Sequence, residues 1–400
     1  MYIGPNTIKK NLVFGYDSGY GAASNHESTR FYAGEPTSNV IPNTSNPNLS
    51  VYGWYGYGWS GGMIVNTEEN AFELTATNGW HNRRYNHGIT SGGTVTVSFD
   101  YKLKSLGTDP VATSHQTYMF ILNGTHLGSY TNYISSISHP DFISGEWKTF
   151  IGSYTANSDS NLAIGVRGKD NAGLSDTVYI KNLQVEAKGH RTPFIKGSRS
   201  STKSLIDLKR TTDIDLSNMS FDSTGQPTFN GVDDYMSMSS IPNIPTTQIT
   251  CEAVINPSRT PSTGTVRGTV IGDQSSLYLG IINSIDGGTG HALHWALPLS
   301  NGSRVASWHG SIPKDKFTHI VGTYDGSTSR AYINGVQVWY ASTSGNVGGT
   351  TYNIGIYNNR TNDGLHNFEG SIPTAKIYNL ALSAQEVQQN FNAYKNRFNI

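Results

Sequence analysis

Alternating apolar and polar positions run through the carboxy-terminal half of the chain and predict short β-strands. Residues 322–324 lead into Asp325-Gly326, residues 330–333 into Asn334-Gly335, and an alternating run follows at 336–340. Asp-Gly and Asn-Gly pairs favour tight hairpins, because both central residues of a type I′ turn need positive φ. The pattern therefore predicts three consecutive antiparallel strands.

The spacing changes to that of a helix close to the end of the sequence. Residues 383–386 read Ser-Ala-Gln-Glu, which is a capping box that begins a helix. Apolar residues then recur on one helical face, at Val387, Phe391, Tyr394 and Phe398. We expect this single short helix to cover an otherwise all-β domain.

Two groups of alternating runs are separated by a basic, polar stretch at residues 189–204, which is typical of a connector. The upstream runs are 94–101, 147–151 and 178–185, and the downstream runs are 249–255, 269–271, 276–282 and 319–324. The predicted fold class is all-β, with two antiparallel jelly-roll β-sandwiches and one short C-terminal helix.

Composition agrees with many short strands joined by turns, since the chain has 44 Gly and 23 Tyr. Only 14% of residues are charged, with 28 basic and 28 acidic side chains, so the basic footprint of nucleic-acid or anionic-membrane binders is missing. No apolar run approaches membrane-spanning length, and we expect no membrane insertion. The one cysteine, Cys251, excludes an intramolecular disulfide and should point inward.

Several motifs resemble one family. Residues 229–235 (Phe-Asn-Gly-Val-Asp-Asp-Tyr), the two hairpin turns and the ending 389–398 (Gln-Asn-Phe-Asn-Ala-Tyr-Lys-Asn-Arg-Phe) are similar to the concanavalin A-like lectin/glucanase (laminin-G-like) domains of tailed-bacteriophage structural proteins. The ending is similar to the Q-N-[FY]-N-A-x-K-x-R-F tail of that group. Residues 192–195 (Thr-Pro-Phe-Ile) resemble the end of carbohydrate-binding-module-like jelly rolls in the same kind of virion protein.

The resemblance also implies an unusual chain path. The family's first strand has the form G-L-V-L-x-[LY]-D, which residues 11–17 fit, although its expected continuation lies at 204–208. We therefore expect residues 1–29 to hold an N-terminal arm and the first strand of the C-terminal sandwich. Residues 30–197 would form an inserted jelly roll and residues 198–400 the concanavalin A-like sandwich, because insertion at an exposed loop is well tolerated. Two domains in simple succession are the alternative.

Catalytic motifs are not found. Related glucanases place paired acids on alternate positions of one strand, in an E-x-D-x-x-E arrangement that this sequence lacks; its adjacent acids are Glu68-Glu69 and Asp233-Asp234. His291 and His294 are three apart, so on a strand they would face opposite sides and could not chelate one metal ion. With no Gly-x-Ser-x-Gly elbow either, we expect the protein not to be an enzyme.

Calcium is the one cofactor that the resemblance implies, because laminin-G-like domains often hold it through loop carboxylates and backbone carbonyls. No cofactor is certain. Four aspartates could contribute: Asp273, Asp286, Asp325 and Asp363. Each lies near a glycine in an expected turn, so turn stabilisation is the alternative role.

Aromatic clusters are the positive sign of a ligand, since exposed rings stack on sugar faces. The densest cluster comprises Tyr52, Trp54, Tyr55, Tyr57 and Trp59. Trp295, Trp308 and His309 form a second candidate surface, and Trp339 and Tyr340 a third. The alternative is that these rings fill a core or a subunit contact.

Two functions follow. The first is a phage virion protein, in a fibre or a head or tail appendage, that displays lectin-like domains for adhesion to host-surface glycans. The second is a purely architectural capsid-decoration or fibre subunit. In either case we expect a homo-oligomer that contacts other virion proteins, is assembled in the host cytoplasm and becomes part of the virion.

Overall fold

The computed structural model describes most of the chain. The described residues are 7–18, 35–38, 40, 55–58, 61–66, 68–69, 71–77, 80–105, 118–123, 133–137, 146–158, 161–167, 175–192, 194, 198–205, 207–222, 226–238, 241, 247–261, 267–272, 277–283, 290–348, 352–357 and 366–400.

The chain forms two compact units. Unit 1 comprises residues 1–36 and 200–400, and unit 2 comprises residues 37–199. Unit 2 thus lies within the sequence of unit 1. We expected the divisions at 29/30 and 197/198, and the structure makes them at 36/37 and 199/200.

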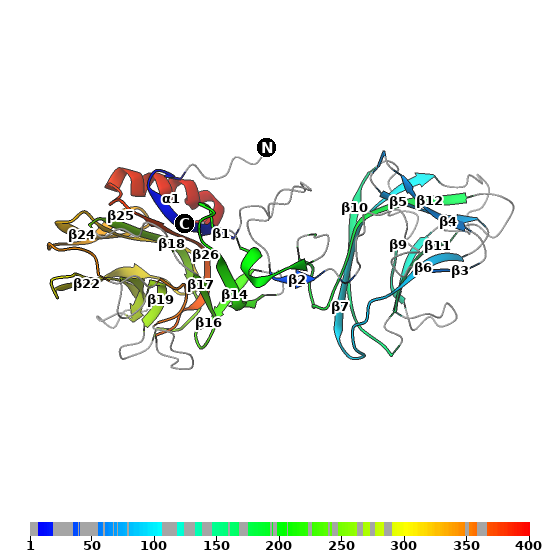
Figure 1. Ribbon diagram of the computed structural model, residues 1–400, viewed down its shortest axis with the longest axis horizontal. Helices are drawn as coiled ribbons and strands as arrows, with labels where there is room; N and C mark the ends of the chain where they lie inside the picture. The colour runs from blue at the N-terminus through cyan, green and yellow to red at the C-terminus, as the bar shows by residue number, and fades with distance from the viewer. Residues whose placement is uncertain are drawn as a thin grey trace. The chain divides into compact units, whose positions relative to one another are not determined.

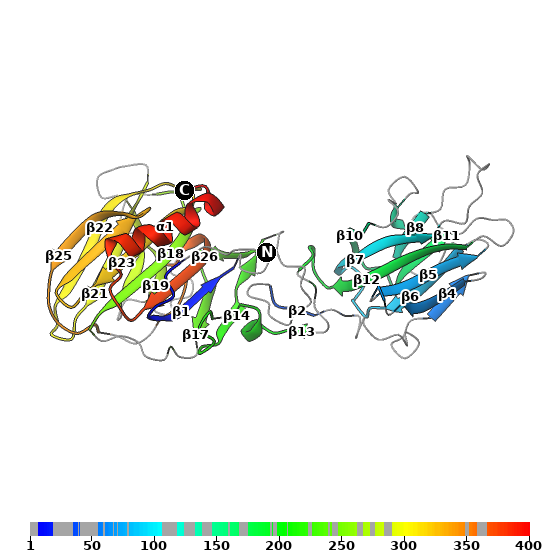
Figure 2. The same ribbon diagram turned by 90° about the horizontal axis from the view of Figure 1, so that it is seen from above.

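Unit 1 is a sandwich of two main sheets with a helix on the outer side of the larger sheet (Figures 1 and 2). The strands of the larger sheet are β1 (Leu12–Asp17), β15 (Ser220–Phe221), β16 (Pro227–Asn230), β18 (Ile249–Pro257), β23 (Thr318–Tyr324), β24 (Thr328–Ile333), β25 (Val336–Ser342) and β26 (Glu369–Tyr378). Their order is β15-β16-β26-β18-β23-β24-β25, and β1 also pairs with β26.

The smaller sheet of unit 1 has the order β19-β20-β21-β22. Its strands are β19 (Arg267–Gly272), β20 (Tyr278–Asn283), β21 (His291–Pro298) and β22 (Arg304–Ile312). A short pair, β14 (Ile214–Asn218) with β17 (Tyr235–Met238), and the 3-10 helix η4 (Ser201–Lys203) complete the unit. The hydrophobic core lies between the two main sheets and contains Cys251, fully buried as predicted.

The first strand of the chain belongs to the sheet formed by its last. β1 pairs antiparallel with β26, with Gly15 opposite Lys376. On the other side of β1, the Gly15 amide donates to Asp207 Oδ1 at 3.1 Å, and the Leu208 amide donates to the Gly15 carbonyl at 2.7 Å. Both neighbours of β1 among the described residues are therefore parts of unit 1.

Both hairpin turns form, but by different geometries. At Asn334-Gly335 both residues have positive φ (49° and 79°), as a type I′ turn requires. At Asp325-Gly326 only Gly326 does (93°), so the expected type I′ geometry is wrong there. Instead, Asp325 Oδ1 accepts hydrogen bonds from the amides of Ser327 and Thr328 and closes a longer turn.

Helix α1 (Ala384–Phe398) begins with the predicted capping box between Ser383 and Glu386. A buried polar network holds it against the larger sheet. Asn390 Nδ2 donates to Glu252 Oε2 at 2.7 Å, and Tyr378 Oη donates to the same oxygen at 3.1 Å. Glu252 and Asn390 are at most 1% exposed, so their polar atoms depend on one another rather than on water.

The charges in this network compensate each other. Burial alone raises the pKa of Glu252, but the nearby Lys376 charge and hydrogen bonds from His319 and Asn390 lower it overall. His319 Nε2 lies 3.0 Å from Glu252 Oε1, and Lys376 Nζ donates to Tyr394 Oη. A buried carboxylate in such a setting stays ionised because it is paired and hydrogen-bonded.

Unit 2 is a jelly-roll sandwich of two five-stranded antiparallel sheets. One sheet has the order β10-β7-β12-β5-β4, made of β4 (Gly61–Asn66), β5 (Ala71–Thr77), β7 (Thr94–Ser105), β10 (Lys148–Thr155) and β12 (Ser175–Glu186). The other has the order β3-β6-β11-β8-β9, made of β3 (Tyr55–Gly58), β6 (Trp80–Asn86), β8 (Tyr118–Asn123), β9 (Tyr133–Ile137) and β11 (Asn161–Arg167). The all-β prediction with a single C-terminal helix is confirmed.

The two ends of unit 2 are joined to each other. β2 (Thr37–Ser38), where the chain enters, pairs with β13 (Ser198–Arg199), where it leaves. The buried Glu186 also accepts hydrogen bonds from the hydroxyls of Thr37 and Thr192, both at 2.6 Å. Thr192 of the Thr-Pro-Phe-Ile motif therefore has a structural role. Among the described residues, no helix is both long and apolar enough to cross a membrane.

Replacing Asn390 tests the network under the helix. We expect Asn390→Ala to lower the free energy of unfolding of unit 1 by about 2–4 kcal/mol, because it removes one of the buried hydrogen bonds to Glu252 and the hydrogen bond that the Ile8 amide donates to Asn390. Urea denaturation measures the change. Asn392→Ala, an exposed substitution on the same helix, is the matched control and should have an effect of about 0.5 kcal/mol or less. Equal losses from both variants would contradict the assigned role.

Candidate functional site

The outer face of the smaller sheet of unit 1 carries aromatic and basic side chains that could bind a ligand. On β21, Leu293, Trp295 and Leu297 point into the core, so the alternate residues point outward. The register then places His294 opposite Trp308 and Ala296 opposite Ala306. We call this surface the Trp308 face and define it by Arg267, Tyr278, His294, Arg304, Ala306 and Trp308.

Trp308 is the exposed aromatic of this face. Its side chain is 46% exposed, and it lies on β22, the edge strand of the sheet. Arg304 is also exposed and lies opposite Pro298 in the register. It precedes Ala306 by two residues and Trp308 by four, so all three side chains lie on the same face of the strand. A stacking ring, a small residue and a charged hydrogen-bond donor therefore follow one another along the edge.

His294 lies next to this edge and is nearly buried. Its ring centroid is 4.6 Å from that of Tyr278 and 6.0 Å from that of Trp308, and its side chain is 2% exposed. Its Nδ1 atom has no hydrogen-bond partner among the described residues. Burial, followed by the positive charges of Arg267 and Arg304, lowers the pKa of His294 to about 3. The imidazole is neutral at neutral pH and holds an unused polar atom.

The β19 side of the face is closed by aromatic packing. Arg267 Nη1 donates to Tyr357 Oη at 3.2 Å, and the Tyr357 ring stacks on His366 with centroids 4.8 Å apart. Tyr357 also meets the edge of the fully buried Tyr278. The accessible part of the Trp308 face is therefore its β22 side.

Trp295 does not belong to a binding surface. Its side chain is fully buried in the core, and its indole nitrogen donates to Ser329 Oγ at 2.8 Å. The ring packs against the larger sheet at Gly322, which has no side chain, and a Cβ there would lie 2.2 Å from the indole. The expectation that Trp295 stacks on sugar is thus corrected: strand alternation turns it away from its neighbour His294.

The third aromatic surface divides in a similar way. The Trp339 ring stacks on that of His309, with centroids 6.3 Å apart. Trp339 is partly buried and packs against the hydrophobic core. Tyr340 is 66% exposed and Val336 63% exposed, both on the edge strand β25 of the larger sheet. β25 therefore presents apolar side chains that are separate from the Trp308 face.

The densest aromatic cluster of the sequence cannot be placed as a surface. Tyr52, Trp54 and Trp59 lie outside the described residues. The backbones of Tyr55 and Tyr57 belong to β3 and pair with Arg84 and Asn82 of β6, but the described part of the structure does not extend to their side chains.

One of the four predicted calcium-binding aspartates has a described environment. Both carboxylate oxygens of Asp325 are engaged: Oδ2 accepts from Arg330 at 2.6 Å and Oδ1 from the residues of its turn. Although partial burial raises the pKa of Asp325, these hydrogen bonds hold it well below its usual value. Asp325 therefore performs the alternative role, turn stabilisation. Asp273, Asp286 and Asp363 lie outside the described residues.

The paired acids of the sequence have structural partners. Glu69 forms an ion pair with Lys102 at 2.6 Å. Asp234 is buried and accepts from Ser220 Oγ and the Asn230 amide. Within the described ranges, no group of three or more His, Cys, Asp or Glu residues is placed to hold a metal ion.

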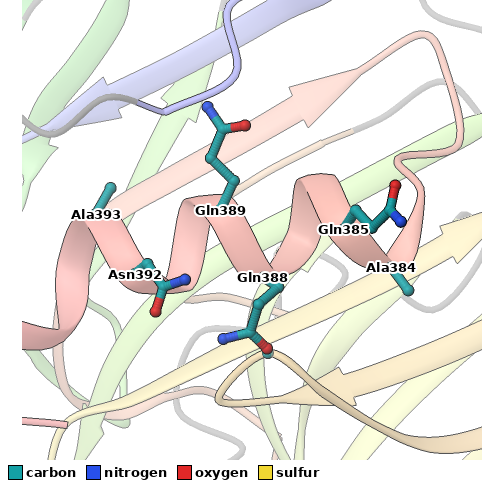
Figure 3. A pocket seen from close by; sticks show the side chains of 7 residues that line it. Ala384, Gln385, Gln388, Gln389, Asn392 and Ala393 are labelled. Atoms are coloured by element: carbon teal, nitrogen blue, oxygen red, sulfur yellow. The ribbon is translucent and has the colours of Figure 1, made fainter.

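Two further surfaces were not predicted. In unit 2, Lys181 Nζ lies 3.8 Å from the Trp147 ring centroid and Lys102 Nζ lies 5.2 Å from it, so cations already occupy the surroundings of this ring. In unit 1, an open hollow of about 680 Å³ runs along helix α1 beside Gly335. Figure 3 shows its amide side chains, which come from Gln385, Gln388, Gln389 and Asn392.

The comparison with known families agrees with this fold. Residues 230–388 match the family model of the concanavalin A-like lectin/glucanases superfamily (Laminin_G_3). Unit 1 carries a concanavalin A-like domain. The match begins at β16 and ends within α1, so β1 and unit 2 lie outside it. No curated protein matches the sequence.

Several solved structures are distantly similar. The binding domain of Paraclostridial Mosquitocidal Protein 1 is 15% identical, with a TM-score of 0.38 over 48% of this chain and 50% of that chain. Domain 4 of the arabinanase AbnA from Geobacillus stearothermophilus, in complex with arabinotriose, is 17% identical, with a TM-score of 0.34 over 48% of this chain and 92% of that chain. The match thus spans only about half of the mosquitocidal binding domain.

The neutral state of His294 predicts a pH dependence of stability. Its folded pKa is below the unfolded value of 6.5, so only the unfolded chain takes up the proton between pH 6.5 and about 3. The free energy of unfolding should therefore fall with pH through this window, by at most about 5 kcal/mol from this residue. Urea denaturation at pH 7 and pH 4.5 should show a smaller acid loss for His294→Gln than for the unchanged protein. His309→Gln, at an exposed position, should not alter the loss, and an unchanged loss in His294→Gln would refute the assignment.

Proposed function

We propose that this chain is a structural protein of a phage virion, in a fibre or a head or tail appendage, that displays its lectin-like domains for adhesion to host-surface glycans. The observation that carries the glycan part is the exposed ring of Trp308 on a sheet face, beside the small Ala306 and the donor Arg304. The concanavalin A-like domain over residues 230–388 supports it, because that superfamily includes lectins.

A flat aromatic ring on a rigid strand suits sugar recognition. The indole buries the C–H groups of a sugar ring, and neighbouring N–H groups reach its hydroxyls. Trp308 keeps its position because β22 is bonded along its length to β21, an interior strand. Single sugar sites of this kind are weak, and repetition in an oligomer raises the overall affinity.

The virion location rests on the resemblance of residues 389–398 to the tail of phage structural domains. In the structure these residues dock the helix: Asn390 joins the buried network, and Arg397 pairs with Asp17 at 2.7 Å. Electron microscopy with a labelled antibody against the chain tests the location. Labelling at a fibre tip would support adhesion, and a regular lattice over the capsid would support architecture.

The architectural role is a second candidate, and one observation favours it. Val336 and Tyr340 expose apolar surface on β25, which is an edge strand among the described residues, and an edge strand can pair with another chain. Such an edge fits a subunit contact as well as it fits a ligand.

Substitution of Trp308 tests the glycan part. We expect Trp308→Ala to weaken glycan binding at least about tenfold, because it removes the stacking surface without changing the core. Isothermal calorimetry against glycans identified on an array gives the affinity, and circular dichroism checks folding. Tyr340→Ala is the matched control: it removes another exposed aromatic side chain, on the other sheet, and should leave the affinity unchanged. Absence of binding to any host lipopolysaccharide or capsular glycan would refute adhesion.

A further inference from the structure

The strands of the smaller sheet carry no acidic residue. β19, β20, β21 and β22 contain two arginines and three histidines but neither aspartate nor glutamate. The whole chain is balanced, with 28 basic and 28 acidic residues, so this absence is local. The outer face of the sheet therefore has positive charge that its own strands do not neutralise.

Arg304 is the accessible part of that charge. It is exposed and forms no hydrogen bond or ion pair with any other described residue. Elsewhere in unit 1, Arg259, Arg330 and Arg397 each pair with a carboxylate. A guanidinium holds five donors in a planar fork that matches an oxyanion, and those of Arg304 remain available.

The position of Arg304 relative to Trp308 sets the geometry of a ligand. Four residues of extended strand separate their Cα atoms by about 13 Å, and the only outward side chain between them is that of Ala306. A chain of sugars that stacks on Trp308 and runs along β22 therefore passes over a small residue and reaches the arginine. Arg267 adds a second positive charge across the sheet. Burial is the main cause of the low pKa of His294, and the charges of both arginines lower this pKa further.

We infer that the Trp308 face binds anionic glycans, with Trp308 stacking on a sugar ring and Arg304 binding a carboxylate or phosphate substituent of the same saccharide. This inference rests on the proposed glycan binding and adds the class of sugar. The structure contributes a guanidinium without a partner among the described residues, an aromatic ring on the same strand face, and four sheet strands without acidic side chains.

A glycan array tests the inference. It should carry uronate-, sialate- and phosphate-bearing glycans, each beside its neutral counterpart with the carboxylate reduced to an alcohol or the phosphate removed. We expect the anionic member of a pair to bind at least about tenfold more tightly, with the preference shrinking in about 0.5 M salt. The arms of the array distinguish carboxylate from phosphate as the recognised group.

Arg304→Gln should lower the affinity for the anionic member about tenfold and leave the neutral member within about twofold. Lys316→Gln is the control: it removes the same charge at an exposed position between β22 and β23, and it should preserve the preference. Melting temperatures of both variants check that they fold.

The outcomes separate the two proposals. If anionic and neutral members bind equally and Trp308→Ala weakens both, the anionic preference is refuted and glycan adhesion stands. If Arg304→Gln and Lys316→Gln reduce anionic binding alike, the effect is a general one of net charge and the inference is refuted. If no glycan binds, both proposals are refuted.

Discussion

The pairing of β1 with β26 is the constraint on which the architecture of unit 1 depends. The two strands are separated by more than 350 residues, yet Tyr16 Oη donates to the Ile372 carbonyl and the Thr374 hydroxyl donates to the Tyr16 carbonyl. Phe14 and Tyr16 are fully buried, so the ladder also delivers side chains to the interior. Unit 2 lies in the sequence between this first strand and the rest of the sheet, and its joined ends, β2 and β13, let the chain leave and return at one place.

The helix explains why the tail motif has its particular residues. Asn390 accepts a hydrogen bond from the Ile8 amide and donates one to Glu252. Arg397 forms an ion pair with Asp17 at the end of β1. The helix is thus fastened both to the first strand and to the central strand β18. Breaking one partner of such a buried network leaves the others uncompensated, which makes it costly to alter even though a buried ion pair adds little net stability. These contacts serve folding, and the motif therefore identifies the domain rather than a binding site.

Local signals in the sequence were sufficient for the elements but not for the site. The Asn334-Gly335 turn and the Ser383 capping box depend on neighbouring residues only, so both could be predicted. Trp295 could not be placed, because alternation shows that Trp295 and His294 face opposite ways without showing which way is outward. The answer depends on Gly322, a residue of a different sheet that leaves room for the indole. Arg304 was detectable in principle, since it stands four residues before Trp308 in one alternating strand.

The side chains of the Trp308 face are held by the strands of the sheet itself rather than by loops. Hydrogen bonds to β20 and β22 on both sides fix His294, and the ring contact with Tyr278 fixes its plane. A ligand there loses little affinity to the ordering of the protein, because strands are already rigid. Because β22 is an edge strand of its sheet in the described part of the structure and Trp308 is exposed, the proposed binding would not require a free end of the sugar chain. The proposed attachment to glycans would combine many weak contacts of this kind.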